Sequence, residues 1–89
     1  LPAGTSVLVI DDDPSVLELM ERFLRKNGHT VHTAPDGRKG LEMARKLKPD
    51  AITLDVMMPE LDGWSVLTQL KSDEELSHIP VIMMSMVNE

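Results

Sequence analysis

The segment LDVMMPELDG, residues 54–63, decides the fold because it places an acid at the end of an apolar run and follows it with turn residues. Residues 51–54, AITL, read as a short strand that is buried on both faces. Pro59 and the Asp-Gly pair that ends at Gly63 are typical of a turn that leads into a helix. The strand therefore ends in the carboxylate of Asp55, and the rest of the sequence indicates what that carboxylate meets.

Strands and helices alternate along the whole chain. Together with residues 51–55, strands are expected at residues 7–10, 30–34 and 80–85. The expected helices run from Pro14 until Gly28 closes the first, from the PDG at 35–37 to Pro49, and from about Asp62 to Leu70. This alternation predicts an α/β fold with a parallel sheet and right-handed crossovers.

The first expected helix is amphipathic. Its apolar positions are Val16, Leu17, Met20, Phe23 and Leu24. They recur at helical spacing, which predicts that this face, Phe23 included, covers the sheet.

Composition excludes several classes of function. The 89 residues suffice for one small domain, and a net charge of −6 without a Lys/Arg cluster argues against direct contact with nucleic acid or an anionic membrane. The chain has no cysteine, which excludes a disulfide framework and a thiol nucleophile. No apolar run reaches the length of a membrane span or resembles a signal peptide. We therefore expect a cytoplasmic domain.

Polar side chains collect at the ends of the expected strands. Asp11 and Asp12 follow the first strand, Asp55 ends the third and Ser85 ends the fourth. Ligands of parallel α/β sheets bind outside the carboxyl ends of the strands, so we expect these side chains at one rim. Crowded carboxylates repel one another, which favours a cation such as Mg²⁺ with a phosphate among its oxygen ligands. Such a site would let a carboxylate oxygen attack phosphorus.

Three segments together resemble a known family, the receiver domain of two-component response regulators and hybrid histidine kinases. They are VLVIDDDP at 7–14, LDVMMPELDG at 54–63 and IPVIMMS at 79–85, in the family's order and spacing. The resemblance implies a flavodoxin-like, three-layer α/β/α fold with strand order 2-1-3-4, without the family's fifth strand and last helices.

The resemblance also implies a role for each residue at the rim. Asp55 would accept the phosphoryl group and Ser85 would be the switch hydroxyl. Asp12 would ligate Mg²⁺ directly and Asp11 through water, with Asp55 and the backbone carbonyl of Met57 completing the protein ligands. The phosphoryl group would come from a histidine kinase or a phosphotransfer domain. Phosphorylation would shift an equilibrium that an effector domain reads, in the same chain or another, so the domain itself would not be a turnover enzyme.

The resemblance ends with the fourth strand. Residues 1–89 would then form a receiver truncated after that strand, with residues 1–6 as a linker. The family's lysine has no counterpart after Ser85, and Met86 stands where the family usually has a small residue. The start LPAGTS, without Met, favours a piece of a longer protein such as a hybrid histidine kinase. The fourth strand would expose an apolar edge, which invites dimerisation.

Two other functions stay open. Haloacid-dehalogenase-type phosphohydrolases place D-x-D after a first strand, so Asp11 would be the nucleophile and Asp13 the acid/base, with Ser85 as the later hydroxyl. Asp13 also suits a plain helix N-cap. A degenerate receiver that serves only as an interaction surface is the other alternative.

Overall fold

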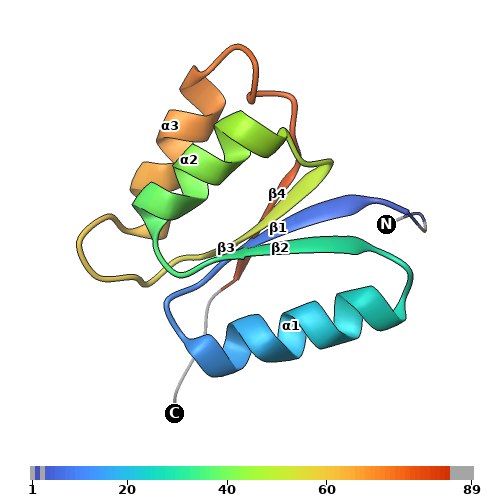
Figure 1. Cartoon of the computed structure of the whole chain (residues 1–89). Coiled ribbons are helices and arrows are strands. Elements are labelled where there is room, and N and C mark those ends of the chain that lie inside the picture. The colour runs from blue at the N-terminus through green and yellow to red at the C-terminus, as the bar shows by residue number, and fades with distance from the viewer. Residues whose placement is uncertain (1, 3, 85–89) are drawn as a thin grey trace.

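Within the part of the chain that the structure describes, residues 2 and 4–84, four parallel strands form one sheet and three helices cover it (Figure 1). The strands of this computed structural model are β1 (Ser6–Ile10), β2 (Thr30–Ala34), β3 (Ala51–Asp55) and β4 (Val81–Met84). The helices are α1 (Pro14–Lys26), α2 (Gly37–Leu47) and α3 (Gly63–Ser72). The strand order is β2-β1-β3-β4, which confirms the predicted flavodoxin-like topology.

The central strand β1 is buried on both faces of the sheet. Val7 and Val9 pack with Leu24 of α1 on one face. Leu8 and Ile10 belong to a larger core on the other face, beneath α2 and α3 (Figure 1). Full burial of each such side chain contributes about 1.5–3 kcal/mol, and this explains why the strand reads as an unbroken apolar run.

Polar contacts close the amino edge of the sheet, far from the predicted site. The amide of Ser6 donates a hydrogen bond to Oδ2 of Asp50 across 2.8 Å. The amide of Asp50 in turn donates to the Ser6 backbone carbonyl at 2.9 Å. These bonds fix the start of β1 against the start of β3.

Each helix begins at an aspartate N-cap. The carboxylates of Asp13, Asp36 and Asp62 accept hydrogen bonds from the amides of Ser15, Lys39 and Ser65, at 2.9, 2.8 and 2.8 Å respectively. A cap of this kind is worth about 1 kcal/mol. Because each cap follows a strand closely, all three helices start at the carboxyl edge of the sheet.

The structure departs from the sequence prediction at several positions. β1 begins at Ser6, one residue before the predicted start, and α3 continues to Ser72, two residues beyond Leu70. The prediction for Phe23 is wrong, since its side chain is 62% exposed. The buried side of α1 centres on Leu24, and successive helical residues point about 100° apart, so Phe23 turns away from the sheet.

β4 lies at one edge of the sheet among the described residues. It pairs with β3, and the side chain of Ile82 is 49% exposed. Dimerisation through this edge stays a prediction. Ser85 and Met86 lie outside the described residues.

Candidate functional site

Three carboxylates meet at the carboxyl edge of the sheet. Ile10 of β1 pairs with Leu54 of β3, so Asp11 and Asp55 follow at matching positions of neighbouring strands. Each of Asp11, Asp12 and Asp55 offers a carboxylate oxygen, and these oxygens lie within 4.8 Å of one another. The sequence prediction that these three acids share one rim agrees with this geometry. We call them the acidic cluster.

Backbone amides orient two of the three carboxylates. The amide of Asp13 donates a hydrogen bond to Oδ1 of Asp11 across 2.9 Å. The amide of Met57 donates to Oδ1 of Asp55 across 3.2 Å. Asp11 is buried, at 7% exposure, whereas Asp12 is exposed, so the acidic cluster opens toward solvent on the side of Asp12.

The electrostatics of the acidic cluster oppose full ionisation. The pKa of Asp55 is raised to about 6, first by burial and then by the neighbouring charges of Asp11 and Asp12, while the amide of Met57 offsets part of the rise. The pKa of Asp11 is also raised, again chiefly by burial. A bound cation would relieve this repulsion, and raised carboxylate pKa values of this kind cluster at functional sites.

The loop between β3 and α3 is packed against the ends of β3 and β4. The amide of Gly63 donates to the carbonyl of Val56 at 3.0 Å, and the amide of Val56 donates to the carbonyl of Met84 at 3.0 Å. A Cβ at Gly63 would overlap the backbone carbonyl oxygen of Asp55 and lie 2.7 Å from Cα of Val56. Only glycine fits this close approach, which explains the Asp-Gly pair of the sequence.

The remaining predicted residues have different outcomes. Asp13 is outside the acidic cluster and caps α1, with Oδ1 bonded to the amide of Ser15 at 2.9 Å. Ser85 lies outside the described residues, and the Met57 carbonyl as a metal ligand stays a prediction. The sequence reasoning missed the hydrogen bond from the Met57 amide. The spacing Asp-x-Met, which lets an aspartate accept from the amide two residues on, is the signal for it.

The donor set of the acidic cluster fits a hard divalent cation. It consists of carboxylate oxygens, and Mg²⁺ prefers oxygen ligands from one or two carboxylates together with waters and phosphate oxygens. Burial and the neighbouring acids raise the pKa of Asp55 in spite of the hydrogen bond from the Met57 amide, so a cation beside this carboxylate would stabilise its ionised form. The residues present therefore suit Mg²⁺.

The parallel sheet and the acidic cluster define a flavodoxin-like domain with its site at the carboxyl edge. The family model of the response regulator receiver domain matches residues 7–89. The chain therefore belongs to the response regulator receiver domain family, a family of two-component signalling, and the predicted resemblance is confirmed.

Two relatives show how much of a longer protein the chain resembles. The DNA-binding dual master transcriptional regulator RpaA of Synechocystis sp. is 41% identical over 83 residues, which are 93% of this chain and 34% of RpaA. Protein PilH of Pseudomonas aeruginosa is 39% identical over 79 residues, which are 89% of this chain and 65% of PilH. The chain thus spans about a third of RpaA and slightly less than two thirds of PilH.

Solved structures agree with the fold. Chemotaxis protein CheY4 of Vibrio cholerae, crystallised at low pH, is 30% identical with a TM-score of 0.90, and the match covers 98% of this chain and 72% of that one. The receiver domain of the sensor histidine kinase PA1611 from Pseudomonas aeruginosa is 31% identical with a TM-score of 0.85, covering 91% and 66%. That structure has a magnesium ion coordinated in the active site cleft.

The length and composition of the helices bear on whether one of them could span a membrane. Over residues 2 and 4–84, each helix is too short or too polar to cross a bilayer.

Proposed function

We propose that Asp55 accepts a phosphoryl group from a phosphohistidine of a histidine kinase or phosphotransfer domain, in a Mg²⁺-dependent step of a two-component phosphorelay. The observation that carries this proposal is the meeting of Asp11, Asp12 and Asp55, whose carboxylate oxygens lie within 4.8 Å of one another. Family membership supports it independently.

The transfer needs an ionised, well oriented Asp55. A pKa of about 6 leaves this carboxylate mostly ionised at neutral pH, and the amide of Met57 holds Oδ1. We assign the attack to Oδ2. A new P–O bond forms as the P–N bond to the donor imidazole breaks, and the imidazole takes up a proton as it leaves.

Asp11, Asp12 and Asp55 would hold the Mg²⁺, with the backbone carbonyl of Met57 as a further oxygen ligand. When bound, Mg²⁺ neutralises negative charge on the transferring phosphoryl group. The burial of Asp11 and the exposure of Asp12 support different roles, with Asp12 as the direct ligand and Asp11 acting through water. The PA1611 receiver, which has a magnesium ion in its active site cleft, supports a Mg²⁺ site in this chain as well.

Ser85 would be the switch hydroxyl that bonds the phosphoryl group and biases its loop between two states. The register of β4 supports this role. Met84 pairs with Asp55, and Ser85 is the next residue along the chain. The Ser85 hydroxyl would thus donate a hydrogen bond to the dianionic phosphoryl group once Asp55 is phosphorylated.

The readout would be an effector domain, in the same chain or in a partner. The DNA-binding role of RpaA belongs to a protein about three times as long as the segment that matches this chain. The net charge of −6 on this chain argues against direct contact with nucleic acid. We place the domain in the cytoplasm as a phosphoacceptor that does not turn over a substrate.

Intact mass spectrometry tests the proposal directly. The chain is incubated with Mg²⁺ and acetyl phosphate, and any adduct is located by peptide mapping. We expect one hydroxylamine-labile phosphoryl group on Asp55, lost with chelator and in Asp55→Asn. Glu74→Gln, which removes an exposed carboxylate outside the acidic cluster, is the matched control and should label normally.

Other results would support the alternatives. Label on Asp11 that survives Asp55→Asn would indicate the phosphohydrolase. The helix-capping role of Asp13 argues against this residue as the acid/base of such an enzyme. The absence of label from a chain extended past the fourth strand would indicate a receiver that acts only as an interaction surface.

A further inference from the structure

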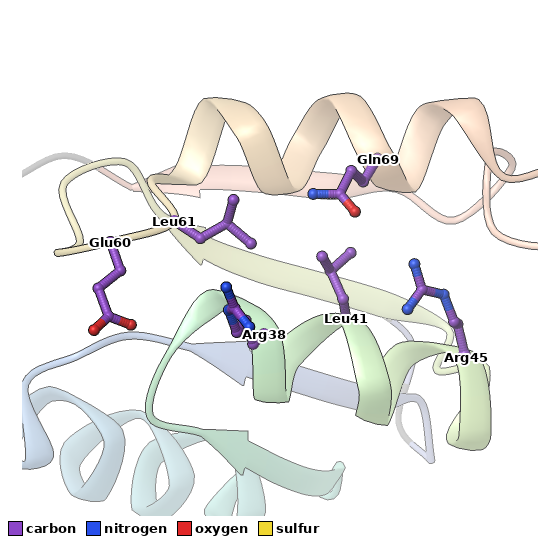
Figure 2. A pocket seen from close by; sticks show the side chains of 6 residues that line it. All are labelled: Arg38, Leu41, Arg45, Glu60, Leu61 and Gln69. Carbon is purple, nitrogen blue, oxygen red and sulfur yellow. The ribbon is translucent and has the colours of Figure 1, made fainter.

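A concave surface lies between α2 and α3, apart from the acidic cluster. It encloses about 810 Å³ and is lined by Arg38, Leu41 and Arg45 of α2, Glu60 and Leu61 of the β3–α3 loop, and Gln69 of α3 (Figure 2). Leu41 is buried and Leu61 is half-buried, so they form an apolar floor. We call this surface the α2–α3 groove.

The arginines of the α2–α3 groove are available to an anionic partner. Within the described residues, Arg38 makes no ion pair. Arg45 lies 3.8 Å from Asp73, and the two side chains are 54% and 30% exposed. An ion pair this long and this exposed is worth little and yields readily to a better acceptor.

The spacing of the groove residues matches one side of a helix. Arg38, Leu41 and Arg45 stand at positions i, i+3 and i+7 of α2, so they form a single stripe. The rise of 1.5 Å per residue separates the two arginines by about 10 Å along the helix axis. Figure 2 shows Leu41 between them, facing Leu61 of the loop.

We infer that the α2–α3 groove is a docking site for an acidic amphipathic helix of a protein partner. Carboxylates at i and i+7 of that helix would pair with Arg38 and Arg45, and apolar side chains at i+3 and i+4 would lie on Leu41 and Leu61. The match is one of charge complementarity: two arginines flank an apolar floor on a chain whose net charge is −6. Elsewhere this net charge would repel an acidic helix.

Glu60 makes the two ends of the groove differ in charge. It lies at the loop end of the groove with a left-handed backbone, at φ 65°. Such a conformation is costly for a residue with a side chain, so the loop geometry holds Glu60 there. A basic residue of the partner helix beside this end would complete the charge pattern and fix the direction of docking.

The groove is joined to the loop that carries Met57. A Cβ at Gly37 would lie 2.9 Å from the carbonyl oxygen of Leu61 and 2.7 Å from Cγ2 of Val66, so α2 packs directly on the loop and on α3. A helix docked on Leu61 therefore contacts the same loop that borders Asp55. The inference nevertheless stands on groove residues alone and does not depend on phosphorylation of Asp55.

The test uses a synthetic helical peptide of about twenty residues, long enough to hold helical structure. It carries Glu at i and i+7 and Leu at i+3 and i+4, and binding to the chain is followed through backbone amide NMR shifts. We expect shifts confined to the groove, and a loss of affinity of about tenfold in each of Arg38→Glu and Arg45→Glu. A peptide with Lys at i and i+7 should bind the variant that carries both Arg38→Glu and Arg45→Glu more tightly than it binds the wild type.

Lys46→Glu is the matched control because it reverses a neighbouring exposed charge of α2 outside the groove. Arg38→Gln and Arg45→Gln repeat the test without a charge reversal, should either Glu variant lose its circular dichroism signal. The inference is overturned if the Glu peptide leaves the groove shifts unchanged, or if Lys46→Glu weakens binding as much as Arg45→Glu. Equal shifts from succinate alone would also overturn it, in favour of a small dianion.

Discussion

The backbone amide of Met57 donates its hydrogen bond to Oδ1 of Asp55 across 3.2 Å, so the residue two positions after the acceptor sets the orientation of its carboxylate. The same carboxylate is partly buried beside Asp11 and Asp12, and its pKa is raised to about 6. One amide therefore offsets only part of the cost of three adjoining acids. This imbalance gives the first predictions.

Asp55→Asn should stabilise the fold in buffer without divalent ions. Because the ionised form of Asp55 is disfavoured in the folded state, a neutral amide of similar shape removes the penalty above pH 6. We expect the free energy of unfolding to rise by about 1–2 kcal/mol, from 1.36 kcal/mol per pKa unit reduced for partial exposure. Urea unfolding measures it, and no gain would contradict the charge penalty.

The gain from Asp55→Asn should depend on pH. The folded pKa is about 6 and the unfolded value is 3.8, so the penalty is complete above pH 6 and disappears as pH falls toward 3.8. We therefore expect the unfolding free energies of the wild type and Asp55→Asn to converge over this window. A difference that stays constant with pH would show that a change in packing causes the gain.

Mg²⁺ should stabilise the wild type and bind less well when the acidic cluster is reduced. Asp11→Asn should lower the affinity for Mg²⁺ by about tenfold, as expected for a group that acts through water, and Asp12→Asn should lower it by more. The fluorescence of Trp64, whose side chain is exposed at the start of α3, follows the titration. Asp13→Asn is the control, because Asn also caps a helix and Asp13 lies outside the cluster. Equal losses in all three variants would point to nonspecific charge.

Gly63→Ala should damage both the fold and the site. The new Cβ would overlap the Asp55 carbonyl oxygen, which is backbone and cannot turn aside. We expect a loss of about 1–3 kcal/mol of stability, together with slower labelling of Asp55 by acetyl phosphate. Gly40→Ala also overpacks, against the Ile10 side chain in the core, and should lose stability but keep its labelling rate. A normal labelling rate in Gly63→Ala would show that the geometry of this loop does not affect phosphorylation of Asp55.

Lys71→Met should loosen the segment that leads into β4. Nζ of Lys71 donates to the carbonyl of Ser77 at 3.1 Å and to that of Ile79 at 2.9 Å. Loss of these bonds should cost about 1–2 kcal/mol and speed amide hydrogen exchange before Val81. Lys46→Met, at an exposed position without such bonds among the described residues, should leave exchange unchanged.

The sequence predicted the strands and the acidic cluster because both depend on local pattern and strand register. β1 is buried on both faces, so its apolar run is unbroken. The neighbouring ends of β1 and β3 bring Asp11 and Asp55 together. Phe23 was placed wrongly because apolar spacing alone does not say how wide the buried stripe of α1 is. The α2–α3 groove was missed because it depends on how two helices and a loop pack.

Other parts of the predicted site stay predictions for a different reason. The predicted switch hydroxyl is on Ser85, which lies outside the described residues, and the predicted ligand role of the Met57 carbonyl stays a prediction. The identity of the acceptor, in contrast, has a chemical test in peptide mapping.

The central position of β1 between β2 and β3 sets the order in which a growing chain assembles its site. During synthesis β2 emerges before β3 and can pair with β1, while β3 follows only after α2. Asp11 and Asp55 stay apart until the β1–β3 pairing forms, so their repulsion does not oppose the earlier step of folding. A nascent chain can therefore bury Val7, Val9, Leu24 and Val31 against one another before Asp11 and Asp55 come together.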